Sequence, residues 1–114
     1  MSNIKTHAFI FENIEYTIYE GKNAQGNNSL LDECNENDIW FHVNNSPSAH
    51  IVLSTTIIKP PKQVIKRCCC ICKASTKTSN KVEIVYTTRS NLEKVNDRGT
   101  VTFIDPAKIK LLSL

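Results

Sequence analysis

The sequence predicts an α+β fold in which a mainly antiparallel sheet of about six to seven strands packs against one main helix. Short segments of alternating polar and apolar residues recur along the chain, and Asn, Gly, Ser and Pro separate them, as in strands joined by turns. A single longer segment, from Lys62 to about Lys77, has apolar residues at helical spacing. A chain of 114 residues of average apolar content is expected to form one domain, spanning residues 1–114.

The first half of the chain is expected to contain two β-hairpins. The strands of the first are Thr6–Glu12 and Glu15–Glu20, on either side of the turn residue Asn13. The strands of the second are Asp38–Val43 and Ala49–Ser54, joined by a loop of Asn, Ser and Pro residues. Between the hairpins the strand pattern breaks at residues 21–28.

A short helix is expected to follow this break. Asn28 or Ser29 could cap it, because a side-chain oxygen at this position accepts from a free amide of the first turn. The helix would continue through Cys34.

The main helix is expected to begin after Pro60 and Pro61, which suit a position where the amides have no partner within the helix. Its apolar stripe consists of Val64, Ile65, Cys68, Cys72 and Ser75, with Cys69 and Ile71 at its flanks. Most of its cations fall outside that stripe: Lys62, Lys66, Arg67, Lys73 and Lys77. The helix is therefore expected to pack with one face and to present positive charge on another.

Three more strands are expected after the main helix, at Lys81–Thr87, Thr100–Ile104 and Lys108–Leu112. The last of them follows the turn signal at Asp105 and Pro106. The predicted order of elements is therefore ββ(α)ββαβββ.

Charge is divided unevenly along the chain. Residues 1–58 contain two lysines and seven acidic residues, a net charge of −5, whereas residues 59–114 contain twelve cations and four acidic residues, a net charge of +8. Clustered cations favour a polyanionic partner, because binding releases the counterions condensed on phosphates. A solvated basic helix face explains the same asymmetry equally well.

The five cysteines favour a reducing compartment. Four of them crowd into residues 68–72, where they cannot form disulfides with one another comfortably. The N-terminus has no apolar signal segment, and no apolar run is long enough to cross a bilayer, so we expect a cytoplasmic protein without a membrane partner. Small thiols also let a helix approach a sheet closely, and this packing role is favoured over redox chemistry.

Alternation along Asp38–Val43 predicts two faces with different roles. One face carries Asp38, Trp40 and His42, which combine an acceptor, an aromatic surface and a donor able to reach a phosphate or a base edge. The opposite face is apolar and belongs to the core. For any of the three residues taken alone, a packed indole and locally bonded imidazoles are the favoured alternative.

His50 on the neighbouring predicted strand could lie near His42 if the turn keeps the two strands in register. Such a pair would permit a metal site or a Cys/His nucleophile, and the second would require a strongly perturbed thiol or imidazole in a cleft. A zinc site needs about four ligands, however, and the one CxxC pair, Cys69 and Cys72, has no second pair elsewhere. We expect no metal and no cofactor.

Signatures of catalysis are missing from the chain. It contains no phosphate-binding Gly-rich motif of the nucleotide-binding folds and no G-x-S-x-G nucleophile motif. The turn at Gly21 could still hold a phosphate through its backbone amides, with Lys22 supplying the charge. We therefore expect neither an enzyme nor a small-molecule substrate.

Several segments, taken together, resemble the NFACT RNA-binding domain over roughly residues 12–112: Tyr16–Asn23, Asn28, Asp38–Val43, Ser48–His50 and Val85–Lys94. The likeness is greatest to the stand-alone, coiled-coil-domain-containing members of that family. It implies binding of RNA, with tRNA and the ribosome as partners of the larger members that act in ribosome-associated quality control. Some stand-alone relatives are associated with DNA sensing.

These observations lead to the hypothesis of a non-catalytic nucleic-acid-binding module whose partner is RNA, with tRNA favoured. Lys22 and Asn23 would hold the phosphate backbone, in a position where many members of the family have Arg in place of Lys. The recognition face would contain an exposed Trp40, and the full set of expected contacts is Lys22, Asn23, Asn28, Asp38, Trp40, His42, His50, Lys66, Arg67, Lys73, Lys94 and Arg98. The alternatives are a protein–protein adaptor that docks on a ribosomal assembly and a DNA-binding module.

Overall fold

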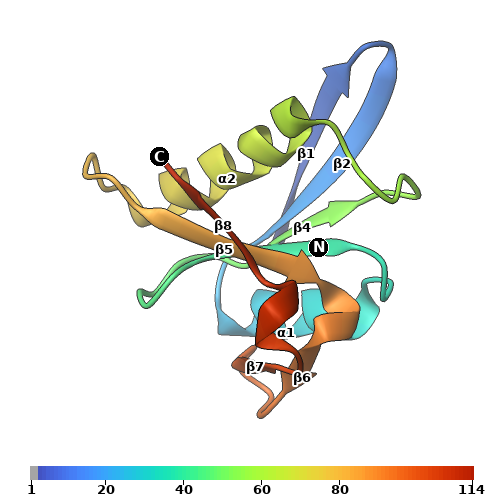
Figure 1. The fold of residues 1–114 in the computed structure, drawn as a ribbon. Coiled ribbons are helices and arrows are strands. Elements are labelled where there is room, and N and C mark those ends of the chain that lie inside the picture. Colours follow the sequence, from blue (N-terminus) through green and yellow to red (C-terminus); the bar gives the residue numbers. More distant parts are fainter. Residues whose placement is uncertain (1–2) are drawn as a thin grey trace.

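The computed structural model describes residues 3–114, so the first two residues of the predicted domain lie outside the described part. Its elements are β1 (Ile4–Phe11), β2 (Ile14–Gly21), α1 (Ala24–Glu33), β3 (Ile39–Val43), β4 (Ile51–Ser54), α2 (Lys62–Thr76), β5 (Glu83–Thr88), β6 (Leu92–Lys94), β7 (Val101–Phe103) and β8 (Lys110–Ser113). Figure 1 shows their arrangement. Short 3-10 turns at Arg89–Asn91 and Pro106–Lys108 complete the chain.

The main sheet has six strands in the order β1-β2-β4-β3-β5-β8, and all its neighbours pair antiparallel. β6 and β7 form a separate two-stranded hairpin. The predicted fold class is confirmed, and so are both predicted hairpins, β1–β2 and β3–β4. β6 was not predicted, because three residues are too few for alternation to show.

The start predicted for the short helix is wrong. α1 begins at Ala24 because Asn23 caps it, with the Asn23 side-chain oxygen accepting from the backbone N–H of Gly26 at 2.9 Å. Asn28 and Ser29, the expected caps, lie inside the helix. The end of the helix at Cys34 agrees with the prediction.

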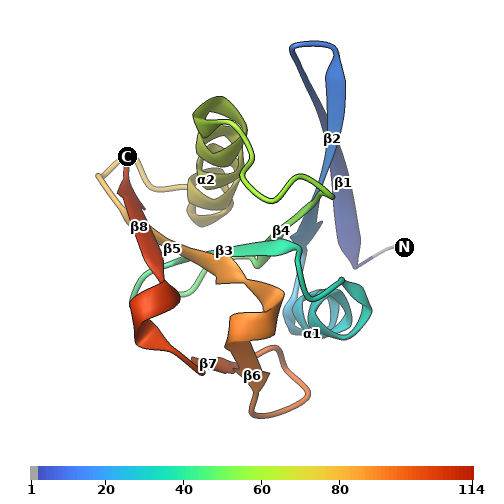
Figure 2. The ribbon, with the colours of Figure 1, turned by 45° about the vertical axis from the view of Figure 1, so that its right-hand side comes forward.

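Both faces of the sheet are covered. Figure 2 shows α2 on one side, and α1 with the β6–β7 hairpin on the other. The α2 side holds the larger core, built around Phe41, Ile18, Ile51 and Val64. The opposite side holds a second core, whose buried members are Leu30, Leu31, Trp40, Val52, Val85 and Leu92. The sheet therefore has no bare face between β4 and β5.

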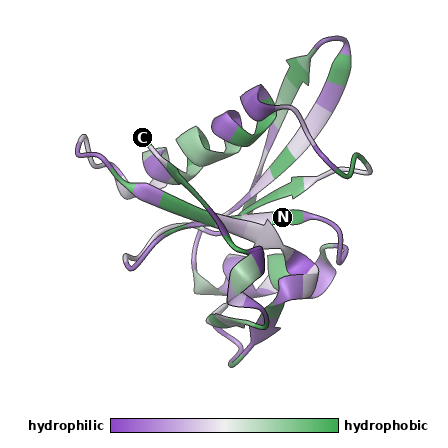
Figure 3. Ribbon diagram, in the orientation of Figure 1, coloured by the Kyte–Doolittle hydropathy of each residue, from purple (hydrophilic) through white to green (hydrophobic). Residues whose placement is uncertain are grey.

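α2 packs through the predicted stripe. Val64, Cys68, Cys69 and Cys72 are buried, while Cys70 is exposed. Figure 3 shows that the first turns of α2 are hydrophilic and that the cysteine-rich turns after them are more hydrophobic. The helix ends at Thr76, and its C-cap, Lys77, has a left-handed backbone with a φ of 58°. Of the described residues, no helix is both long and apolar enough to cross a membrane.

The N-terminal turn of α1 is seated tightly against the end of the sheet. A Cβ added to Gly26 would lie 2.0 Å from the carbonyl oxygen of Asn3, and one added to Gly21 would lie 2.0 Å from Oδ1 of Asn27. That Oδ1 accepts from the backbone N–H of His50 at 3.1 Å, which ties α1 to the start of β4. Glycine at these positions permits a contact that a side chain would prevent.

This contact predicts that Gly26→Ala lowers the free energy of unfolding, by about 1–3 kcal/mol, because the new methyl group must displace the Asn3 backbone. The sign is informative, since alanine in place of glycine inside a helix normally stabilises by about 0.5–1 kcal/mol. Urea unfolding of both proteins measures the difference. Gln25→Ala, on the exposed side of the same turn, is the control and should leave stability nearly unchanged. A Gly26→Ala protein as stable as the wild type would contradict the described packing.

Candidate nucleic-acid interface

The pairing of β3 with β4 brings two histidines together. Trp40 lies opposite Val52 and Phe41 opposite Ile51, so the next pair in this antiparallel register is His42 and His50. Their ring centroids are 5.1 Å apart, with the rings nearly perpendicular. The expectation that these two imidazoles are neighbours is confirmed.

Trp40 contacts both histidines. Its indole N–H donates to Nδ1 of His50 at 3.0 Å. Its ring stacks on His42, with the centroids 5.6 Å apart and the planes within 5° of parallel. The three side chains form one cluster, which we call the Trp–His cluster.

The expected exposed face of β3 is wrong for two of its three residues. Trp40 is 3% exposed, because α1 and the β6–β7 hairpin cover it, with Phe103 meeting the indole edge-on at 5.9 Å between ring centroids. Asp38 is buried as well, and its carboxylate accepts from the backbone N–H groups of Asn35 at 2.9 Å and Thr55 at 3.4 Å. Both residues hold the fold together. His42, half-buried, remains at the surface of the cluster.

The hydrogen bonds of the cluster determine which nitrogen of each neutral imidazole carries the proton. An indole N–H can only donate, so Nδ1 of His50 carries no proton and the neutral ring is protonated at Nε2. A backbone carbonyl can only accept, so Nδ1 of His42, 2.6 Å from the oxygen of Val43, carries the proton and Nε2 is left as an acceptor. Burial, and secondarily the charge of His42, lowers the pKa of His50 to about 3, and burial also lowers the pKa of His42.

A hollow of about 440 Å³ opens above the Trp–His cluster, and we call it the imidazole hollow. Its floor includes His42, His50, Trp40 and Val85 from the sheet. Val101 and Phe103 of β7 form an apolar wall. The loops at residues 44–48 and 98–100 form its rim.

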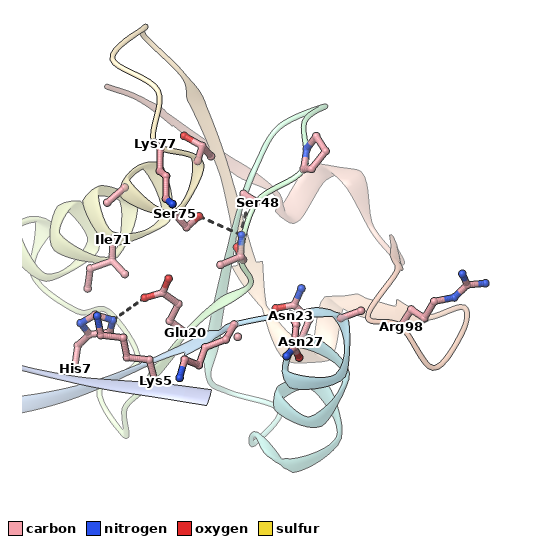
Figure 4. A pocket seen from close by; sticks show the side chains of 17 residues that line it. Lys5, His7, Glu20, Asn23, Asn27, Ser48, Ile71, Ser75, Lys77 and Arg98 are labelled. Atoms are coloured by element: carbon pink, nitrogen blue, oxygen red, sulfur yellow. Dashed lines mark hydrogen bonds and ion pairs between the residues drawn. The ribbon is translucent and has the colours of Figure 1, made fainter. Parts of the chain in front are cut away.

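A second hollow, of about 770 Å³, adjoins the first, and we call it the cationic hollow. Four cations from four separate segments line it: Lys5, Lys22, Lys77 and Arg98. The one acidic residue in its lining, Glu20, is engaged by His7 at 2.9 Å. Figure 4 shows Lys5, His7 and Lys77 around the opening and Arg98 beyond Asn23 and Asn27. The two hollows share Asn27, Pro47, Ser48 and Arg98.

The predicted contact residues divide between this site and other surfaces. Lys22, Asn23 and Arg98 line the cationic hollow, and His42 and His50 line the imidazole hollow. Asn23 is already engaged as the cap of α1, and its amide N–H donates to Oδ1 of Asn3 at 3.0 Å. Asn28 lines neither hollow, and its Oδ1 is buried without a hydrogen-bond partner among the described residues.

The cations expected to widen the electrostatic field are mostly elsewhere. Lys94 pairs with Asp32 at 2.7 Å, and Arg67 lies over the ring of Phe9 at 5.6 Å from its centroid. Lys66 and Lys73 on α2 line neither hollow. Of this group, Arg98 alone reaches the site that the structure describes.

Sequence reasoning missed Lys5 and Lys77 as site residues. Lys5 is an isolated cation in β1, and Lys77 ends α2, more than seventy residues later. No local motif connects them. They meet at one hollow because β1 pairs with β2 and the C-terminal end of α2 lies beside the same strands.

The thiols whose pKa values are raised by burial do not provide an activated nucleophile. Burial raises the pKa of Cys69 to about 12 and the pKa values of Cys34 and Cys72 to about 11, so these thiols are protonated near neutral pH. The one strongly perturbed imidazole, His50, has a lowered pKa, which makes it a poor base. Within residues 3–114 no group of three His, Cys, Asp or Glu side chains is placed to hold a metal ion.

Comparison with known proteins identifies similar sequences and a similar structure. Residues 5–105 match the model of the NFACT protein RNA binding domain. Coiled-coil domain-containing protein 25 of Danio rerio and that of Mus musculus are each 35% identical over 108 residues, which cover 87% of this chain and 52% of the relative. The homolog from Dictyostelium discoideum is 31% identical over 105 residues, 84% of this chain and 51% of the relative. The chain thus spans about half the length of these curated relatives.

A solved structure has the same fold. It is described as the C-terminal of the fibronectin/fibrinogen-binding protein from Streptococcus suis, and it superposes with a TM-score of 0.80 over 96% of this chain and 45% of that one. Its sequence identity is 23%, so the likeness concerns the fold alone.

The buried His50 predicts that stability falls on acidification. Between about pH 6.5 and pH 3 the unfolded chain binds a proton that the native His50 does not, so the free energy of unfolding decreases as pH falls, by at most about 1.4 kcal/mol per pH unit for this group. His42 adds to the slope in the same direction. His50→Gln should make the slope between pH 6.5 and pH 4 shallower, as measured by urea unfolding.

The control for this prediction is Val85→Ala. It loosens the same core without removing an imidazole, so it should lower stability at every pH and keep the wild-type slope. An unchanged slope in His50→Gln would contradict the described burial of His50.

Proposed function

This chain belongs to the NFACT RNA-binding domain family, and we propose that it is a non-catalytic module that holds RNA over the cationic hollow. The observation that carries this proposal is that Lys5, Lys22 and Lys77, from three separate segments, line one opening whose single acidic residue is hydrogen-bonded to His7, with Arg98 at its edge and directed outward (Figure 4). All four side chains are exposed. We propose that residues 1–114 act together as one such module.

Phosphate contacts would supply most of the affinity. Lysine and arginine side chains reach phosphate oxygens without demanding a particular base, and each contact releases condensed counterions. Arg98 lies on the rim that the two hollows share, where it can contact a phosphate or a sugar next to the imidazole hollow. Lys22 follows directly after Gly21, at the point where the chain turns from β2 toward α1.

The preferred RNA in this proposal is structured, as in tRNA, and the setting is cytoplasmic and ribosome-associated. Support for the preferred RNA and the ribosome association comes from family membership and from the resemblance of the motifs around Lys22, Trp40 and His50, whereas the cytoplasmic setting is proposed on the five free cysteines. The absence of catalysis is proposed on the raised pKa values of Cys69 and Cys72 and the lowered pKa of His50, which deprive a Cys/His mechanism of both its nucleophile and its base.

A second candidate function, protein docking, is favoured by a different surface. A groove of about 400 Å³ near the start of α2 has an apolar lining that includes Ile39, Ile58, Ile65, Tyr86 and Leu112. Its rim carries four lysines and no acidic residue: Lys59, Lys62, Lys108 and Lys110. The complementary occupant is a protein segment that combines acidic and apolar side chains.

The RNA-binding proposal predicts a salt-dependent affinity to which the cationic hollow contributes directly. The logarithm of the binding constant should fall linearly with the logarithm of salt concentration, and Lys22→Ala should reduce that slope by about 0.7–0.9, because one phosphate contact is lost. A salt titration of binding to tRNA by fluorescence anisotropy measures both slopes.

Lys59→Ala is the matched control for this experiment. It also removes one lysine charge, but Lys59 lies just before the N-terminal end of α2, whereas the cationic hollow lies at the C-terminal end. The helix has 15 residues and is therefore about 22 Å long. The slope should stay close to that of the wild type. Equal slopes for Lys22→Ala and the wild type, or a flat dependence for all three proteins, would contradict binding at this hollow.

Competition identifies the class of nucleic acid. We expect tRNA to displace a labelled tRNA more effectively than a DNA duplex carrying the same number of phosphates, and crosslinking in cells followed by sequencing should recover tRNA. A duplex DNA that competes equally well would contradict the preference for RNA while leaving nucleic-acid binding in place.

The docking alternative makes the opposite prediction. Binding to purified ribosomes would be lost on Ile58→Asp in the apolar groove and would survive Lys22→Ala. Cosedimentation of the three proteins with ribosomes at two salt concentrations separates the two functions. Loss of binding in Lys22→Ala together with normal binding of Ile58→Asp would exclude the docking alternative.

A further inference from the structure

We propose that the imidazole hollow binds one unpaired nucleobase of the RNA, and that it recognises the edge of that base through the Nε2–H group of His50 and the Nε2 acceptor of His42. This inference rests on the proposed function and deepens it, because it assigns the bases and the phosphates of the RNA to two adjacent hollows.

The first step is the hydrogen-bonding state of the two imidazoles. Nδ1 of His50 is occupied by the indole of Trp40, and Nδ1 of His42 is occupied by the carbonyl of Val43. Neither Nε2 atom bonds to another residue within the described part of the chain, and neither is sealed off from solvent. The hollow therefore presents one free donor and one free acceptor, at rings whose centroids are 5.1 Å apart.

The second step is the kind of group that such a pair accepts. The Watson–Crick edge of every nucleobase offers a donor next to an acceptor, which complements an acceptor next to a donor. A phosphate has only acceptors, so it would face the lone pair of His42 without a hydrogen bond. The two rings are also uncharged at neutral pH and would not compensate the charge of an anion. The chemistry of the hollow thus favours a base over a phosphate.

The third step is shape. A volume of about 440 Å³ lies within the range of roughly 300–1,000 Å³ that is typical of pockets for small organic groups. Val101 and Phe103 line the same hollow as the two histidines, so the face of a base can pack on apolar side chains while its edge meets the imidazoles. The loops of the rim are exposed at Asn45, Ser46 and Thr100, so an extruded base can enter from solvent.

The fourth step is the position of the hollow beside the phosphate site. Asn27, Pro47, Ser48 and Arg98 line both hollows, so no element of the fold separates them. An RNA strand held by Lys22 and Arg98 would have its sugar at this shared rim. One of its bases would then be directed toward the Trp–His cluster.

The experiment compares RNAs that differ only in their bases. Single-stranded homo-oligomers of each of the four nucleotides are measured against an abasic oligomer of the same length, which keeps every phosphate and sugar. For the wild type, at least one homo-oligomer should bind about tenfold more tightly than the abasic one, as expected for a base contact. The dependence on salt should be the same for both, because the phosphate contacts are the same.

Two variants test the hollow, with a matched control. Thr100→Trp fills the rim and should reduce the difference between base and abasic RNA to less than about twofold. His42→Phe keeps a ring on Trp40 but removes the acceptor, and it should reduce the difference in the same way. Thr102→Trp makes the same substitution at an exposed position of β7 outside both hollows and should bind as the wild type does.

A spectroscopic readout does not depend on affinity. In long-range ¹H–¹⁵N spectra of the histidine side chains, the preferred homo-oligomer should shift the Nε2 resonances of His42 and His50, and abasic RNA should not. If no homo-oligomer binds the wild type better than abasic RNA, the base site is overturned, while salt-dependent binding of both would leave the proposed function standing. If neither these oligomers nor tRNA binds with a dependence on salt, the proposed function itself fails.

Discussion

The hydrogen bond from the indole of Trp40 to His50 links the core to the surface of this domain. It satisfies a buried N–H whose loss of a partner would cost about 1–3 kcal/mol, and so allows a tryptophan to fill the second core. The same bond places the single proton of His50 on its outward nitrogen. One buried contact thus stabilises the sheet and sets the chemical character of the imidazole hollow.

Much of the fold could be predicted because its signals are local. Alternation located the strands of both hairpins, and small thiols at helical spacing located the buried face of α2 around Cys68 and Cys72. The start of α1 could not be predicted in this way, since Asn23 and Asn28 are equally suitable caps and the choice depends on the contact of Gly26 with Asn3. The burial of Trp40 could not be predicted either, because the segments that cover it, α1 and β6–β7, are separate from β3 in the sequence.

The position of the cationic hollow could not be predicted from the distribution of charge along the sequence either. The basic second half of the chain suggested a basic surface there, yet the cationic hollow draws Lys5 and Lys22 from the acidic half and Lys77 and Arg98 from the basic half. The densest run of cations, around Lys66 and Arg67, lies on α2 away from the hollow. Net charge along a sequence therefore indicates whether a polyanionic partner is favoured, but it does not indicate where on the surface the cations gather. Their positions depend on how the strands pair.

The imidazole hollow has a floor and a rim of different character. Its floor belongs to strands packed on both faces, where almost any substitution disturbs a core, whereas its rim consists of the short loops at 44–48 and 98–100. Loops of this kind tolerate replacement and insertion with little loss of stability. Related proteins can therefore diverge in what they select while inheriting one unaltered scaffold, and an engineer seeking new selectivity would randomise those loops first.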